Sequence, residues 1–223
     1  PFAAAPVKLS RAHLAASEPA GDGRFGWASA IVSTSGCANA ATGLPGDRDQ
    51  ADVARALADA AVVPVERTLL LSTGVIGTRL PLDLVRSALA ALVPTGLSPT
   101  GEGLEAAAAA LRTTDSRAKL ATVALTLPSP DGTPVEIRVS GIAKGVGMIH
   151  PRMATMLAIV LTDATIEPAV LHGLLRPAAA RTWDQLSVDG DTSTNDTVFV
   201  LASGAAGSAP VEAGSPAAAI LGR

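Results

Sequence analysis

Two uninterrupted apolar runs constrain the fold of this chain most. The run 156–162 reads Met-Leu-Ala-Ile-Val-Leu-Thr, and the run 197–202 reads Thr-Val-Phe-Val-Leu-Ala. Strands that are buried on both faces show continuous apolar sequence of this kind, whereas half-exposed strands alternate. The sequence therefore predicts two fully buried core strands.

Shorter patterns predict the remaining elements. Further strands are expected at 27–33, 69–72, 120–127 and 134–140, the last two forming a hairpin. Helices are expected at 47–61, 82–92, 102–112 and 168–180. The stretch 34–43 is predicted to be turn-rich, and the tail 203–219 is predicted to be loose. Because strands and helices alternate irregularly, an α+β or layered α/β class is expected.

Composition excludes several classes of function. Hydrophobic residues make up 48% of the 223 residues, and the net charge is -3 with scattered Lys and Arg, so no nucleic-acid surface is expected. The sequence contains no run of 18 uncharged apolar residues, so no membrane span is expected. The three histidines are not spaced as metal ligands. The single cysteine, Cys37, cannot form a disulfide within the chain, which fits a reducing compartment and a cytoplasmic location.

The segment 144–157 holds the most informative residues for function. Lys144 can meet a carboxylate, and the two glycines within the next three residues let the backbone approach a ligand closely. The segment is not a P-loop, because the Gly-Lys-Ser/Thr ending is missing. A small residue, Ala154, precedes Thr155, which opens the first apolar run.

Thr155 has two interpretations. As an ordinary residue at the start of a strand it needs no function, and the pattern alone favours that reading. If the peptide bond before it breaks, however, Thr155 carries both a nucleophilic hydroxyl and a free α-amine. With a reference pKa of roughly 7.7–8.0, that amine can act as a base near neutral pH.

A second segment, 72–77, reads Ser-Thr-Gly-Val-Ile-Gly and directly follows a predicted strand. Thr73 offers a hydroxyl and Gly74 an unobstructed backbone N–H, and such a pair can bind a developing oxyanion. One donor of this kind stabilises a transition state by about 3–4 kcal/mol. The alternative is a strand-to-turn junction with a capping threonine.

Two further polar segments are ambiguous. The acidic stretch 189–197 is spaced loosely like a calcium loop, but its glycine is at the second position and no Glu closes it. A turn that hydrogen-bonds its own backbone is therefore favoured. The triplet 113–115, Thr-Thr-Asp, follows a predicted helix and is typical of a cap or a solvated turn.

Together these motifs resemble the bifunctional glutamate N-acetyltransferase/ornithine acetyltransferase family of arginine biosynthesis. The resemblance is carried by residues 5–7, 72–77, 113–115, 144–157 and 188–197. It implies an α+β fold, a layered α-β-β-α sandwich, and a self-cleaving precursor of the N-terminal-nucleophile kind. It also implies that family members extend well beyond the last of these motifs.

The resemblance implies cleavage between Ala154 and Thr155. An α-chain segment, 1–154, and the start of an incomplete β-chain, 155–223, would result. Family members often combine such chains into heterotetramers of two α and two β chains. No nucleic-acid or membrane partner is implied.

The resemblance also implies a role for each motif residue. Thr155 would take the acetyl group from N-acetylornithine and pass it to glutamate, while Thr73 and Gly74 form the oxyanion hole. Thr113 and Lys144 match substrate-binding positions, as does Thr155 itself. No cofactor or metal is implied, although bifunctional members also take acetyl-CoA as a co-substrate.

Three alternatives stay open beside this interpretation. Thr34 and Cys37 depart from the family's Asn-Ser-Gly-Asn-Ala-Asn pattern, so a paralogous acetyltransferase of a specialised pathway, with another acceptor, is one alternative. A self-processing aminopeptidase or amidase would share the nucleophile and use water as the acceptor. A degenerate, non-enzymatic relative is disfavoured because the motif hydroxyls, glycine and lysine are all present. Cys37 is a weak alternative nucleophile, since no histidine is near it in sequence.

Overall fold

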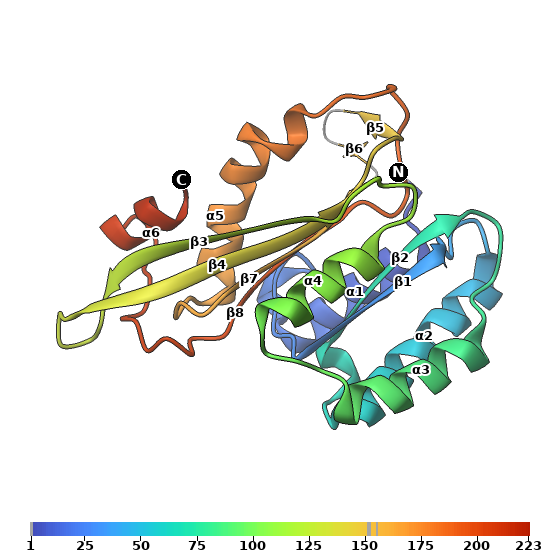
Figure 1. The fold of residues 1–223 in the computed structure, drawn as a ribbon, viewed down its shortest axis with the longest axis horizontal. Coiled ribbons are helices and arrows are strands. Elements are labelled where there is room, and N and C mark those ends of the chain that lie inside the picture. Colours follow the sequence, from blue (N-terminus) through green and yellow to red (C-terminus); the bar gives the residue numbers. More distant parts are fainter. Residues whose placement is uncertain (1, 151–152, 155) are drawn as a thin grey trace.

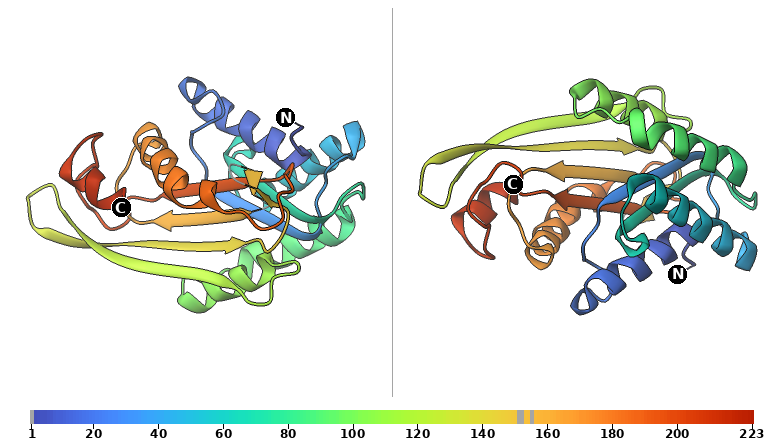
Figure 2. Two further views of the ribbon diagram at one scale, coloured as in Figure 1. Left: turned by 90° about the horizontal axis from the view of Figure 1, so that it is seen from above. Right: turned by 90° about the horizontal axis from the view of Figure 1, so that it is seen from below.

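Two β-sheets share one apolar core in this protein, and helices cover their outer sides (Figures 1 and 2). The computed structural model describes residues 2–150, 153–154 and 156–223. A two-stranded parallel sheet packs near a four-stranded mixed sheet of order β3-β4-β7-β8. The arrangement confirms the predicted α+β class and its layered sandwich of helices and sheets.

The strands form these two sheets and one short hairpin. In chain order they are β1 (Ala30–Cys37), β2 (Thr68–Val75), β3 (Lys119–Pro128), β4 (Pro134–Lys144), β5 (Ile149–His150), β6 (Met153–Ala154), β7 (Leu157–Thr162) and β8 (Thr197–Ala202). β1 runs parallel to β2. The strands β3 and β4 form the predicted antiparallel hairpin. β7 lies between β4, to which it is antiparallel, and β8, to which it is parallel. The two apolar runs that opened the sequence analysis are thus neighbours, β7 and β8.

The helices pack around the sheets. They are α1 (Ala5–Ser17), α2 (Gly43–Ala61), α3 (Leu82–Thr95), α4 (Gly101–Leu111), α5 (Pro168–Arg181) and α6 (Pro216–Leu221). Short 3-10 turns lie at Pro19–Gly21, Val65–Arg67 and Trp183–Gln185. α2 and α3 pack against each other beside the smaller sheet, and α5 packs against β8 (Figure 1).

Strand β2 organises the core because both of its faces are buried. Leu70 packs into a cluster with residues of α2 and α3, whereas Leu69 and Leu71 pack into a second cluster with α4, β4, β7 and β8. Successive side chains of a strand point to opposite faces, so one strand can supply both clusters. Each fully buried leucine contributes about 1.5–3 kcal/mol of transfer free energy.

Two expectations about local structure are wrong. The polar residues 34–37 continue strand β1 instead of turning, because the ladder to β2 runs on through the pairs Thr34↔Ser72 and Gly36↔Gly74. The tail is not loose throughout, because α6 forms and Val211 and Ala218 are buried in a core cluster beside the β3–β4 hairpin. The apolar residues of the tail are too widely spaced to show a helical or strand period, so the sequence did not predict this packing.

Helix α1 was not predicted. Leu9 and Leu14 pack against the two core clusters, and buried polar contacts join the helix to β2. The Ser10 hydroxyl donates to the Leu70 carbonyl oxygen at 3.1 Å and accepts from the Leu70 N–H at 2.9 Å. His13 Nδ1 lies 2.8 Å from the Thr68 carbonyl oxygen. The buried Ser10 hydroxyl thus satisfies both the backbone N–H and the backbone carbonyl of Leu70. Hydrophobic periodicity in the sequence does not reveal a contact of this kind.

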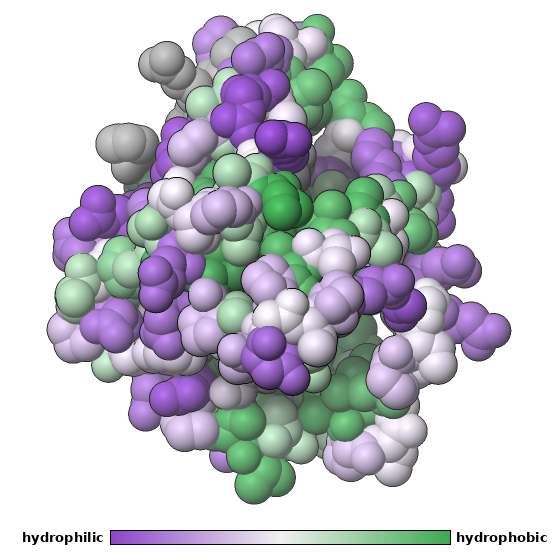
Figure 3. Space-filling view, turned by 90° about the vertical axis from the view of Figure 1, so that its left-hand side faces the viewer, coloured by the Kyte–Doolittle hydropathy of each residue, from purple (hydrophilic) through white to green (hydrophobic). Residues whose placement is uncertain are grey.

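Strand β3 leaves much of the four-stranded sheet's edge exposed. Leu120 and Val123 on this strand remain 44% and 52% exposed. On the face at the hairpin end of the molecule, apolar residues lie together near the centre and polar residues surround them (Figure 3). Within the described ranges, none of the helices combines the length and the apolar character needed to cross a membrane.

Candidate active site

The ends of three core strands converge on one point. β2 carries Thr73 and Gly74 just before its last residue, Val75. β4 ends in Lys144, which is paired with Leu157 at the beginning of β7. Glycine and lysine motifs that are far apart in the sequence therefore meet at the ends of adjacent layers.

The Lys144 ammonium group donates a hydrogen bond to the Thr73 hydroxyl oxygen at 3.0 Å. Both residues are only 4% exposed. Burial lowers the pKa of Lys144, and the carboxylate of Asp115 partly offsets that effect. Because Thr73 accepts from the ammonium, its own hydroxyl proton is free to be donated to another group.

Asp115 anchors the chain that follows Lys144. One carboxylate oxygen, Oδ1, accepts the Gly145 N–H at 2.9 Å and also pairs with Lys119. Burial alone would raise the pKa of Asp115, but the Lys119 ammonium and the Gly145 amide hold it below its ordinary value. Of the two expectations for 113–115, a cap or a solvated turn, the solvated turn does not hold for Asp115, whose other oxygen is buried without a partner in the described part of the chain.

Gly74 occupies a position that only glycine fits. Its φ is +130°, and a Cβ added there would lie 2.2 Å from the backbone carbon of Gly36. The close approach of β1 and β2 at this pair thus depends on the absence of a side chain at Gly74. Thr73, one residue earlier, can keep its side chain because it points away from this contact toward Lys144.

Asn195 joins the segment 189–197 to the ends of both strands of the small sheet. Its amide nitrogen donates to the carbonyl oxygens of Ala38, at 2.7 Å, and Ser72, at 2.8 Å. Asn195 is 6% exposed, so both bonds are buried. The segment is therefore not simply the turn bonded to its own backbone that the sequence predicted, and sequence reasoning assigned Asn195 no role.

The remaining predicted residues have mixed positions. Thr155 lies outside the described residues, while the next residue, Met156, is buried and its carbonyl oxygen accepts the Thr197 N–H at 3.1 Å. Thr113 is exposed just after α4. Ala154 closes strand β6.

The two residues that depart from the family pattern lie on β1 beside the site. The Thr34 hydroxyl donates to the Ser72 hydroxyl oxygen at 2.9 Å. The Cys37 thiol is buried and donates to the Thr78 carbonyl oxygen at 2.9 Å. A buried thiol engaged in this way packs as a small apolar residue, which weakens its case as a nucleophile.

Asp196 is a buried carboxyl next to this region. Neither of its oxygens has a hydrogen-bond partner among the described residues. Burial raises the pKa of Asp196 to about 6, with the nearby Ser193 hydroxyl and Met156 amide opposing the shift. The ionised side chain is therefore a cost to folding near neutral pH.

Replacing Asp196 by Asn is expected to stabilise the protein at pH 8. A carboxyl whose pKa is raised on folding favours the native state below its unfolded pKa and loses that contribution as pH rises through about 6. After allowance for partial exposure, we expect about 1 kcal/mol at pH 8 and no difference at pH 3. Urea unfolding of Asp196→Asn in a Thr155→Ala background, in which the expected self-cleavage has no nucleophile, measures this. The exposed neighbour Asp191, changed to Asn, is the control, and an equal gain at both pH values would contradict the prediction.

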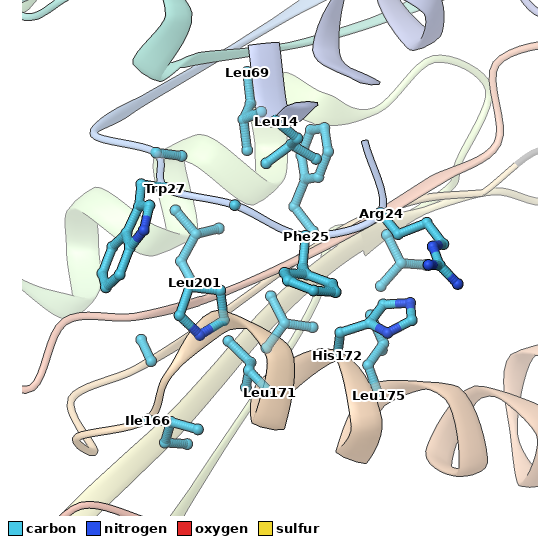
Figure 4. A pocket seen from close by; sticks show the side chains of 17 residues that line it. Leu14, Arg24, Phe25, Trp27, Leu69, Ile166, Leu171, His172, Leu175 and Leu201 are labelled. Atoms are coloured by element: carbon cyan, nitrogen blue, oxygen red, sulfur yellow. The ribbon is translucent and has the colours of Figure 1, made fainter. Parts of the chain in front are cut away.

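A separate apolar pocket lies between the loop before β1 and helix α5 (Figure 4). Its volume is about 110 Å³, and Leu14, Phe25, Leu171 and Leu201 are among its lining residues. The His172 ring lies against that of Phe25, with ring centroids 5.7 Å apart. None of the converging residues at the strand ends lines it, so it is distinct from the candidate active site.

Among residues 2–150, 153–154 and 156–223, no three His, Cys, Asp or Glu side chains gather as metal ligands do.

The sequence is similar to proteins of arginine biosynthesis. Residues 1–221 match the model of the ArgJ family. The mitochondrial arginine biosynthesis bifunctional protein ArgJ of Aspergillus terreus is 44% identical over 211 residues, which cover 94% of this chain and 44% of that protein. Its namesake in Penicillium rubens is 44% identical over 213 residues, covering 95% of this chain and 42% of that protein. The chain thus spans less than half the length of these relatives.

Solved structures show the same likeness. The crystal structure of the arginine biosynthesis bifunctional protein ArgJ from Bacillus halodurans matches with a TM-score of 0.54 at 32% identity, covering 69% of this chain and 71% of that one. The ornithine acetyltransferase from Mycobacterium tuberculosis, complexed with ornithine, matches with a TM-score of 0.52 at 30% identity, covering 69% and 72%.

The names of the relatives also bear on location. Both fungal proteins are named as mitochondrial, so the expected cytoplasmic location is wrong by this comparison. The resemblance found in the sequence motifs is confirmed over nearly the whole length of the chain, and this protein belongs to the ArgJ family.

Proposed function

We propose that this chain contributes the nucleophile of an N-acetyltransferase that moves acetyl from N-acetylornithine to glutamate. The observation that carries the proposal is the buried contact of 3.0 Å between Lys144 and Thr73, at the convergence of three strand ends. It joins a carboxylate-binding cation to an oxyanion donor. The relatives named for arginine biosynthesis, and the one named as an ornithine acetyltransferase, supply the substrate class.

The proposal begins with self-cleavage between Ala154 and Thr155. The Thr155 hydroxyl attacks the Ala154 carbonyl carbon, the C–N bond breaks, and the acyl group passes to the hydroxyl oxygen as an ester. Water then hydrolyses the ester, which leaves a carboxylate on Ala154 and a free α-amine on Thr155. The products are the segments 1–154 and 155–223 of this sequence.

Transfer then uses the freed threonine as in other N-terminal nucleophiles. The Thr155 oxygen attacks the acetyl carbon, the α-amine takes the hydroxyl proton, and that proton goes to the departing nitrogen of ornithine. The α-amine of glutamate attacks the acetyl ester and regenerates the hydroxyl. This two-step scheme predicts ping-pong kinetics.

Thr73 and Gly74 stabilise the oxyanion of both tetrahedral intermediates in this scheme. The contact with Lys144 supports the role of Thr73, because a hydroxyl that accepts from an ammonium is polarised toward donation. Lys144 also offers its positive charge to the α-carboxylate that both substrates carry. Thr113, which is exposed just after α4, is proposed to contact the substrate.

Further parts of the proposal follow the family. The two chains assemble into a heterotetramer, no cofactor or metal takes part, and acetyl-CoA serves as a second donor if the protein is bifunctional. A mitochondrial location is proposed from the names of the fungal relatives. An acceptor other than glutamate is the variant of the proposal that Thr34 and Cys37 suggest.

Two measurements on the purified protein test the proposal. Intact mass is expected to show a break between residues 154 and 155, and N-acetylornithine is expected to release ornithine at least about tenfold faster with glutamate than without it. Dominant release without glutamate would favour an aminopeptidase or amidase instead. Transfer only to another amino acid would favour a paralogue of a specialised pathway, and an unbroken chain would contradict the whole scheme.

A further inference from the structure

Asp189 binds backbone amides of a distant segment. Its Oδ2 accepts the Met148 N–H at 2.6 Å and its Oδ1 accepts the Ile149 N–H at 2.9 Å. A third bond, from the Asp191 N–H at 3.3 Å, is the only local one of the three. These amide bonds hold the pKa of Asp189 below its ordinary value.

The amides that Asp189 binds belong to a strained turn. Met148 has a φ of +57°, a conformation in which a side chain other than glycine costs about 1 kcal/mol or more. A Cβ added at Gly147 would lie 3.2 Å from Asp189 Oδ2, so the absence of a side chain there gives the carboxylate room. A carboxylate that binds two successive amides can hold such a turn, because charge-assisted hydrogen bonds are stronger than neutral ones.

The strained turn leads directly into the hairpin that carries Ala154. Ile149 opens β5 and is paired with Ala154 at the end of β6. The carbonyl oxygen of Ile149 also accepts the Val188 N–H at 3.0 Å, so the segments around residues 149 and 189 bond in both directions. Asp189 thus fixes one strand of a two-stranded hairpin whose other strand ends at the proposed scissile bond.

We propose that Asp189 is a positioning residue for self-cleavage, acting through the Met148 and Ile149 amides on the β5–β6 hairpin that presents the Ala154 carbonyl. The inference rests on the proposed self-cleavage and adds a residue to it. Asp189 forms no hydrogen bond or ion pair with the converging group of Thr73, Gly74 and Lys144 that we assign to transfer. Replacing Asp189 is therefore expected to change the rate of self-cleavage more than it changes substrate binding.

Variants of Asp189 test the inference in the intact chain. Asp189→Asn keeps one acceptor oxygen but turns an NH2 group toward an amide donor, and Asp189→Ala keeps no acceptor. Because a shift of reacting groups by about 1 Å costs on the order of a hundredfold in rate, we expect cleavage about tenfold slower in the Asn variant and about a hundredfold slower in the Ala variant. The measurement is intact mass against time after dilution from denaturant.

Asp131 provides a matched control. It caps the turn of the distant β3–β4 hairpin, where its carboxylate accepts the Thr133 N–H at 3.0 Å, and it is exposed like Asp189. Asp131→Asn is expected to leave the cleavage rate unchanged. Hydrogen exchange adds a local readout: the Met148 and Ile149 amides should exchange faster in both Asp189 variants, while amides of β3 keep their protection.

The outcomes separate this inference from the function on which it rests. If the wild-type chain does not break at 154/155, the proposed function fails. If it breaks, and Asp189→Ala breaks at the wild-type rate although its Met148 and Ile149 amides exchange faster, the positioning role is overturned. Equal slowing by Asp131→Asn would overturn it as well, because the effect would then be general. Slow cleavage confined to the Asp189 variants, in the order Ala slower than Asn, supports it.

Discussion

Thr155→Ala is expected to abolish both self-cleavage and acetyl transfer. The substitution removes the only atom that the proposed scheme uses to attack either carbonyl, so the rates should fall by at least about a thousandfold. Intact mass should show one unbroken chain after prolonged incubation, and ornithine release should not exceed the rate without enzyme. Thr155→Ser, which keeps a hydroxyl, should retain measurable cleavage.

A threonine on an exposed strand provides the control for this experiment. Thr126 lies on β3, far from the strand ends that converge on Lys144, and is exposed. Thr126→Ala should cleave at the wild-type rate. Cleavage between residues 154 and 155 in Thr155→Ala would contradict the nucleophile assignment and leave proteolysis by another enzyme as the explanation of any break.

Gly74→Ala is expected to have the largest effect on stability of any single change at the site. The added Cβ would lie 2.2 Å from a backbone carbon of Gly36, which no rotamer can relieve, and the φ of +130° is strained for alanine. We expect a loss of about 3 kcal/mol or more in the free energy of unfolding, because β1 and β2 must separate to accept the methyl group. Urea unfolding measures this loss, and cleavage should fail in parallel.

Gly36→Ala is the control that separates the cost of the steric clash at position 74 from the cost of backbone strain at a positive φ. Gly36 is the partner of Gly74 across the ladder and has a similar φ of +112°, but a Cβ added there meets no atom within 4 Å. Its replacement should cost only the strain, about 1–2 kcal/mol. Equal losses in the two variants would show that backbone conformation, and not the approach of the strands, requires glycine at position 74.

Hydrophobic pattern predicted most of the elements but not their limits. The continuous runs at 156–162 and 197–202 became β7 and β8, and the alternating stretches became the β3–β4 hairpin. Pattern failed where polar residues continue an element. Strand β1 runs on through 34–37 because β2 supplies a parallel ladder, and a ladder partner is a property of the folded chain.

The residues of the candidate site also fall into two groups, those that the sequence motifs identified and those whose roles only the structure shows. Thr73, Gly74 and Lys144 were found from motifs, and the structure brings them together although Thr73 and Lys144 are 71 residues apart in the chain. The roles of Asp115 and Asn195 were missed, because their partners lie in other segments. The triplet 113–115 and the stretch 189–197 gave the signal that polar residues were clustered there, but not which backbone groups they would meet.

The sequence by itself determined which long apolar runs become buried strands and which residues carry the family's motifs. These are local properties, since they depend on side-chain volume, polarity and order along the chain. Tertiary structure decided which polar groups pair. Asn195 reaches Ser72 across 123 residues, and Asp189 reaches Met148 across 41. Such pairs depend on how the strands pack, because apolar burial sets the positions of the segments, and buried backbone polar groups are satisfied by the partners that lie within reach there.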